Sequence, residues 1–260
     1  MNTKVTLVLL MVCNMALADF PPLDSSPFSE KEILERRDKA EQAKLDLGAG
    51  DLERLALGST YAHIEKAKMY KGASTDLLYK ILRDKRFSLR WHKVATTISI
   101  VSDDKGLDAL KEYITSPLSE TSYKFLSHDI KARGAAMRGL VARFYEEDIE
   151  WIKPFLLEHA QDASWSKYKG YEKTKPEPLA KLADEAMLAI ARMKTEDAME
   201  MLGKIREQYA APGNSSTKAQ PLSTDTRNKL DRVDMYIQMT NEIADDMARR
   251  ESEMRSGITN

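Results

Sequence analysis

The chain has 260 residues with 40 basic and 41 acidic side chains, so its formal net charge of −1 favours neither nucleic acid nor any other single class of partner. Its single cysteine, Cys13, lies close to the N-terminus, which excludes disulfide and thiolate chemistry from the rest of the chain. The length is enough for a sizeable core, either in one domain or in an elongated array.

Residues 1–18 have the pattern of a secretory signal peptide. Lys4 precedes a compact apolar segment, and Ala16-Leu17-Ala18 forms a small-x-small site for cleavage. Removal of this peptide takes away one lysine and no acid, so the net charge becomes about −2. We therefore expect cleavage after Ala18 and export of the rest of the chain.

Two alternatives to a cleaved signal, a membrane anchor and a lipoprotein, are disfavoured. A membrane anchor is disfavoured because the apolar segment is shorter than the roughly 20 residues that span a bilayer. A lipoprotein acylated at Cys13 is disfavoured because Val12 stands where such signals carry Gly, Ala or Ser. A cysteine-free exported chain fits a bacterial periplasm better than a disulfide-rich extracellular space, so we expect a periplasmic or secreted bacterial protein.

The segment that follows the signal changes from extended to helical. Residues 19–28 contain three prolines, which favours an extended leader. Ser29 and Glu32 then have the spacing of a capping box, which starts a helix. We expect N-terminal helices over 29–73, the first ending at the glycines near residue 50 and the second interrupted by Gly58.

Residues 74–210 repeat one pattern, an apolar helical stripe followed by a short acidic turn and another helix. The segment 142–148, ARFYEED, reappears 49 residues later at 191–197 as ARMKTED, and an earlier unit matches at an offset of 42. The match lies in the pattern of residue types. Such a period indicates stacked helical hairpins.

The run from Asp129 to Leu140 resembles the second helix of a HEAT-like repeat, in which an Asp and an Arg lie near the inter-helix turn and paired alanines permit close packing. The resemblance covers about half of the chain. It implies an all-α fold, a right-handed α-solenoid of HEAT-like helical hairpins with N-terminal helices and a long C-terminal helix. Such solenoids usually serve as binding scaffolds, and the resemblance implies no catalytic residues.

The C-terminal part separates into a linker and a helix. Residues 211–225 are rich in Pro, Gly, Ser and Thr, which is typical of a linker. Residues 226–260 predict a long amphipathic helix with a narrow apolar seam at Leu230, Val233, Ile237, Thr240, Ala244 and Met247. We expect the seam to fold back as a cap, because repeat arrays need their terminal apolar surface covered. A dimer contact or a docking helix is the alternative.

Motifs of metal, cofactor or nucleophilic chemistry are not recognisable in the sequence. Glycine-rich phosphate loops and a G-x-S-x-G elbow are absent, and the four histidines are scattered singly, at His63, His92, His128 and His159. We therefore expect no cofactor and no enzymatic activity.

Paired acids are the basis of an alternative function. Asp103-Asp104, Glu146-Glu147 and Asp245-Asp246 offer carboxylates of the kind that a glycosidase uses in pairs. The first two pairs fall in turns that we expect to begin a helix, where negative charge complements the helix N-terminus. A structural role is thus the favoured interpretation, with a helical cell-envelope hydrolase as the alternative.

Basic residues gather in two predicted second helices. Residues 80–93 contain six basic side chains and one acid, and residues 131–145 contain four basic side chains and no acid. On the concave face of a HEAT-like array these clusters would lie side by side and attract an acidic partner. We therefore expect partner binding by Arg86, Arg90, Lys93, Lys131, Arg133 and Arg138. A solvated face neutralised by acidic turns is the alternative.

Residues 161–178 are predicted to form a loop in which aromatic residues and lysines alternate. Trp165 and Tyr168 would anchor a contact while the lysines meet acidic groups or lipid phosphates. The alternative is that the aromatic rings tuck back and close a neighbouring core.

Together these patterns predict an exported helical repeat protein that binds an acidic protein partner, as an envelope assembly or regulatory factor or as an inhibitor or immunity protein. Nucleic acid is not expected as a partner. Besides the hydrolase, a binder of anionic lipid or envelope polymer is the alternative, with contact to a membrane surface but no integral segment. The oligomeric state is left open.

Overall fold

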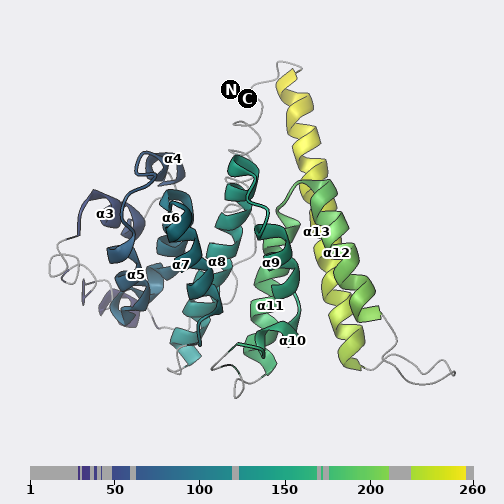
Figure 1. Ribbon diagram of the computed structural model, residues 1–260, viewed down its shortest axis with the longest axis horizontal. Helices are drawn as coiled ribbons and strands as arrows, with labels where there is room; N and C mark the ends of the chain where they lie inside the picture. The colour runs from purple at the N-terminus through teal and green to yellow at the C-terminus, as the bar shows by residue number, and fades with distance from the viewer. Residues whose placement is uncertain are drawn as a thin grey trace.

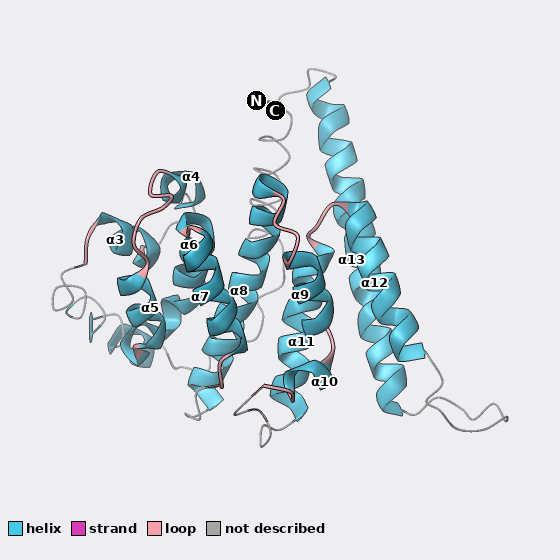
Figure 2. Cartoon of the chain, in the orientation of Figure 1, coloured by secondary structure: helices cyan, strands magenta, loops and turns pink. Residues whose placement is uncertain are grey.

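The computed structural model describes residues 29, 31–35, 38–39, 42, 49–58, 63–118, 123–168, 171, 176–210 and 224–255. Over these residues the chain forms helices and no strand (Figure 2), which confirms the all-α class. The predicted signal peptide 1–18, the leader 19–28 and most of the predicted linker 211–225 lie outside the described residues.

The N-terminal helices begin and break where the sequence predicts. The backbone N–H of Ser29 donates to the Glu32 carboxylate at 2.9 Å, and the N–H of Glu32 donates to the Ser29 hydroxyl at 3.4 Å, which confirms the capping box. Helix α3 (Asp51–Leu57) ends at Gly58, and the short helix α4 (His63–Lys68) follows. Gly58 therefore interrupts the predicted second helix.

The described helices follow one another across the molecule from α3 at one end to α13 at the other (Figure 1). After α4 the described part of the chain forms ten further helices. In chain order they are α5 (Asp76–Arg83), the 3₁₀ helix η1 (Lys85–Arg90), α6 (Trp91–Val101), α7 (Asp104–Thr115), α8 (Tyr123–Glu147), α9 (Ile152–His159), α10 (Asp162–Trp165), α11 (Pro176–Ala191), α12 (Thr195–Ala210) and α13 (Thr224–Arg255).

Four of these helices form a continuous layer, which we call the second-helix row: α6, α8, α11 and α13. Helix α8 packs between α6 and α11, and α11 packs in turn against α13. The row is backed by α7, α9 and α12, which pack against α8, α11 and α13 respectively. Each long helix of the row is thus paired with a helix that precedes it in the chain.

The predicted apolar stripes form the core of this arrangement. Val94 and Ile98 of α6, Met137 and Leu140 of α8, and Leu182 of α11 are each 0% exposed. Burial of such side chains contributes about 1.5–3 kcal/mol each, so the spacing that predicts the helices also holds the row together.

Helix α8 approaches both of its neighbours closely because glycine lies on each side of it. A Cβ atom at Gly139 would stand 2.5 Å from the Cβ of Ser99 on α6, and one at Gly134 would meet the side chain of Glu185 on α11. Ala135 and Ala136, between the two glycines, are also buried. This agrees with the expectation that small residues permit close packing in this helix.

The substitution Gly139→Ala is expected to lower the free energy of unfolding by about 1–3 kcal/mol, because α6 and α8 would have to separate. Gly203→Ala in α12 is the matched control, since nothing lies within 4 Å of its added Cβ. The free energy of unfolding of that variant should rise by up to about 1 kcal/mol, from helix propensity alone. Urea unfolding followed by circular dichroism measures both, and equal changes in the two variants would contradict the close approach.

The C-terminal helix begins at Thr224, two residues before the predicted boundary, and packs along α12 and α11. Val233 and Thr240 of the predicted seam are buried, and Arg232 forms ion pairs with Asp184 at 3.1 Å and with Asp162 at 3.3 Å. In Figure 1 the last turns of α13 project beyond α12. The first part of the seam therefore folds back on the array as expected.

The acidic pairs differ in their positions. Asp103 caps α7, accepting a hydrogen bond of 2.9 Å from the N–H of Gly106, as predicted. The prediction for Glu146-Glu147 was wrong: these residues end α8, and there they pair with Lys68 and Lys71 next to α4. Positive side chains at this position compensate the acids, which the helix C-terminus disfavours.

Candidate functional site

The structure brings part of the predicted basic cluster together where α6 packs against α8. His92, in the first turn of α6, is the centre of this region. Its pKa is lowered to about 4, mainly by burial and then by the positive charges of Lys93, Arg90 and Arg138, with His128 contributing least. Cations from η1, α6 and α8 therefore lie around one histidine.

We call the group Arg90, Lys93, Lys131 and Arg138 the basic face; all four side chains are half-buried. Lys131 lies two turns before Arg138 and thus on the same side of α8. Arg138 forms an ion pair with Glu185 of α11, and the Lys93 ammonium donates to the Gly58 carbonyl at 3.0 Å. Within the described ranges Arg90 and Lys131 form no ion pair, so the basic face keeps uncompensated positive charge.

Arg86, also predicted to bind a partner, is bound to a neighbouring acid. Its Nη2 and Nε donate to Oδ2 of Asp84 at 2.6 Å and 3.0 Å. The other carboxylate oxygen of Asp84, Oδ1, accepts from the Arg86 backbone N–H at 2.9 Å. This arrangement caps η1 and lowers the pKa of Asp84, although burial opposes the shift. The local ion pair offsets the charge that Arg86 was expected to offer.

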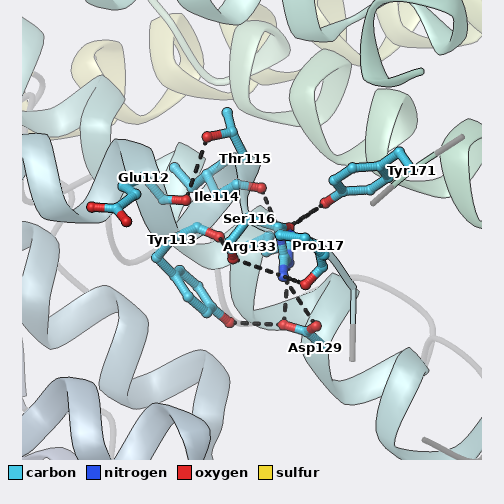
Figure 3. Close-up of polar contacts among 9 residues, drawn as sticks. All are labelled: Glu112, Tyr113, Ile114, Thr115, Ser116, Pro117, Asp129, Arg133 and Tyr171. Atoms are coloured by element: carbon cyan, nitrogen blue, oxygen red, sulfur yellow. Dashed lines mark hydrogen bonds and ion pairs between the residues drawn. The ribbon is translucent and has the colours of Figure 1, made fainter. Parts of the chain in front are cut away.

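Arg133 is not a surface residue, and its prediction as a partner contact was wrong. It is 1% exposed and lies at the end of α7, where helix carbonyls lack intrahelical partners (Figure 3). Its guanidinium donates to the carbonyls of Ile114, Ser116 and Pro117 at 2.6, 2.5 and 3.2 Å. It also forms an ion pair with Asp129 at 3.2 Å. All of its nitrogens are engaged, so Arg133 ties α8 to α7.

Two tyrosines complete this buried network. The Tyr113 hydroxyl donates to Asp129 at 3.0 Å, and the Tyr171 hydroxyl donates to the Ser116 carbonyl at 2.7 Å while accepting from Arg133 at 2.9 Å. Burial raises the pKa of Tyr113 well above its usual value and that of Tyr171 to about 12, so both phenols stay protonated. The i, i+4 spacing of Asp129 and Arg133 is the signal that could have indicated this pair from the sequence.

The aromatic residues predicted to contact a partner also turn inward. Trp165 is 0% exposed at the end of α10, and its indole N–H donates to the His159 carbonyl at 2.9 Å. The Tyr168 hydroxyl lies 2.7 Å from Nε2 of His159, and Tyr168 is half-buried. Of the predicted loop 161–178, residues 162–165 form α10 and α11 begins at Pro176, whereas residues 169–170 and 172–175 lie outside the described part of the chain. Trp165 closes the core, as the alternative interpretation held.

Nowhere in the described parts of the chain do three or more His, Cys, Asp or Glu side chains come together in a way that would hold a metal ion. Among the helices that the structure describes, none has both the length and the apolar character needed to cross a bilayer.

Comparisons of the chain with protein-family models, with curated proteins and with solved structures found no match. The case for a function therefore depends on the geometry of the basic face.

The environment of His92 predicts a dependence of stability on pH. The pKa of His92 is lower in the folded than in the unfolded chain. Its contribution to the free energy of unfolding is therefore complete above pH 6.5 and is lost as the pH falls toward 4. We expect this loss to reach about 2 kcal/mol, reduced by solvent screening of a half-buried group. We compare the free energy of unfolding in urea at pH 7.5 and at pH 4.5. Between these two pH values the His92→Gln variant should lose less stability than the wild type, by about the contribution of His92. Identical losses would contradict the assignment.

Proposed function

We propose that the chain is an exported, periplasmic binding module that acts by protein–protein interaction, with an acidic protein as its partner. The observation that carries the proposal is the basic face. It joins cations of η1, α6 and α8, and the charges that act most strongly on His92 are all positive. Positive potential on one face raises the association rate with an acidic partner.

The scaffold that we propose is a right-handed α-solenoid of HEAT-like helical hairpins. The second-helix row supports it, because α8, α11 and α13 each pack on the helix before them in the row and on a preceding partner helix. The Asp129–Arg133 pair also lies at the turn between α7 and α8, where the resemblance expects such residues. Stacked hairpins of this kind offer an extended surface to a partner.

The mechanism would be occupancy: the basic face covers an acidic surface and thereby shields, inhibits or positions the protein that carries it. Both proposed uses, an envelope assembly or regulatory factor and an inhibitor or immunity protein, depend on this same contact. Neither requires chemistry from the chain, and the buried Arg133 and Trp165 take no part in the contact.

The test is capture of partners from an envelope fraction by the tagged protein, compared with the variant Arg90→Glu, Lys131→Glu, Arg138→Gln. Glutamine is used at the third position because glutamate there would face Glu185. We expect the wild type to capture an acidic protein and the variant to bind it at least about tenfold more weakly, as loss of about 1.4 kcal/mol implies.

The matched control changes the same amount of charge on other surfaces, by Lys80→Glu, Lys105→Glu and Arg227→Gln, all at exposed positions. This control should bind like the wild type, and added salt should weaken the wild-type complex. Equal binding by the two variants would refute the basic face as the contact, provided that both unfold at the wild-type temperature.

A further inference from the structure

A second surface, separate from the basic face, is a pocket of about 190 Å³ between the α5–η1 segment, the start of α6, the end of α7 and α8. One water needs about 10–15 Å³, so the pocket has room for a group of several heavy atoms. It is lined by Leu82, Arg83, Lys85, Trp91, Tyr113, Ser116, Pro117, Asp129 and Arg133.

The floor of this pocket is polar but already satisfied. Arg133 and Asp129 pair with each other, and Tyr113 donates to the same carboxylate (Figure 3). The indole N–H of Trp91 donates to the carbonyls of Ile81 and Asp84 at 3.0 and 3.1 Å. Trp91 therefore contributes its ring to the wall of the pocket, as Leu82 contributes its side chain.

The rim, by contrast, carries two positive side chains that pair with no acid among the described residues. Arg83 and Lys85 are exposed, and neither forms an ion pair within the part of the chain that the structure describes. Asp84, which lies between them in the chain, is occupied by Arg86. The Lys85 ammonium lies 5.4 Å from the centre of the Phe125 ring, which holds it beside α8 without neutralising it.

We propose that this pocket binds a carboxylate carried on a short aliphatic stem. Arg83 and Lys85 would contact the carboxylate, since a guanidinium matches its two oxygens, while Leu82, Trp91 and Pro117 would contact the stem. The Asp129–Arg133 pair in the floor adds no net charge, so Arg83 and Lys85 supply the positive charge of the pocket.

Two sources share this chemistry, the glutamate side chain of an acidic polypeptide and a free dicarboxylate. The site lies on the side of α8 that faces α7, whereas Arg138 of the basic face pairs with Glu185 on α11. The proposal therefore goes beyond the proposed function, and its test does not depend on it.

The experiment titrates the full chain with glutarate, with a capped triglutamate peptide and with glutaramide, the uncharged analogue. The readout is the indole NMR signal of Trp91, one of three tryptophans, assigned by its loss in Trp91→Phe. We expect a saturable shift of this signal with glutarate or with the peptide and none with glutaramide. Tighter binding of the peptide identifies an acidic polypeptide as the ligand, and tighter binding of glutarate identifies a small dicarboxylate.

The variant Arg83→Gln, Lys85→Gln should bind the charged probe at least about tenfold more weakly. The matched control Lys80→Gln, Lys105→Gln removes the same charge from exposed positions outside the pocket and should bind like the wild type. The proposal is overturned if neither charged probe shifts Trp91 at millimolar concentration, if glutaramide shifts it equally, or if the double variant retains wild-type affinity.

Discussion

The variant Arg133→Met is expected to lose about 3–5 kcal/mol of unfolding free energy, the largest effect that the buried network predicts. Methionine keeps most of the volume but removes the ion pair of Arg133 with the buried Asp129 carboxylate. It also removes the donors from the carbonyls of Ile114, Ser116 and Pro117 at the end of α7. Unfolding in urea followed by circular dichroism measures the loss.

Two companion variants separate the causes. Arg133→Met combined with Asp129→Leu should recover part of the stability, because the buried carboxylate that lost its cation is then also removed. Arg138→Met, which breaks the half-buried pair with Glu185, should cost only about 0–1 kcal/mol. If Arg133→Met unfolded like the wild type and lost only partner binding, the assignment of Arg133 to the core would be wrong.

Trp165→Ala is expected to cost about 3–5 kcal/mol, because it opens a cavity in a fully buried aromatic cluster. The indole packs edge-on against His159, with ring centres 4.8 Å apart, and its centre lies 5.9 Å from that of Tyr171. The substitution also removes the hydrogen bond to the His159 carbonyl. Urea unfolding measures this loss of unfolding free energy, and the midpoint temperature of thermal unfolding should fall with it.

The Trp165→Phe variant should lose less unfolding free energy than Trp165→Ala, since a ring still fills much of the space. Met69→Ala is the exposed control: Met69 is 82% exposed, and its loss should change stability by less than about 0.5 kcal/mol. A Trp165→Ala protein as stable as the Met69→Ala protein would show that the indole is not part of the core, and would return Trp165 to the list of candidate contacts.

The two residues show how burial changes a functional interpretation. A tryptophan among lysines, or an arginine in an acid-free stretch, has the composition of a binding surface. Here the same side chains satisfy the end of α7 and fill the space beside α10. The contacts that we propose are therefore the basic face, Arg90, Lys93, Lys131 and Arg138, and Arg83 and Lys85 beside the pocket.

Helices and core positions were largely predictable from the sequence, because they depend on local spacing. The stripe Trp91, Val94, Ala95, Ile98 and Val101 is buried throughout, and the break at Gly58 occurs as expected. A period of 3.6 residues places such side chains on one side of a helix whatever the helix packs against. Capping by Ser29 and Asp103 is likewise encoded within four residues of chain.

The burial and the partners of the polar residues could not be predicted in the same way. Arg133 and Arg138 are five residues apart on α8 and therefore about 140° apart around the helix axis. The sequence shows this angle but not which helix lies on either side. Arg133 meets the end of α7 and is buried, whereas Arg138 meets Glu185 at the surface.

The helical class, the core stripes and the caps could thus be predicted from the sequence, since each follows from residues within a few turns of one another. Which charges remain available depends on packing between helices, as for Glu146-Glu147 at the end of α8 and for the rim of the pocket. The physical reason is that a charged side chain is stabilised by donors, acceptors and solvent contributed by other helices. Local spacing carries no record of those neighbours.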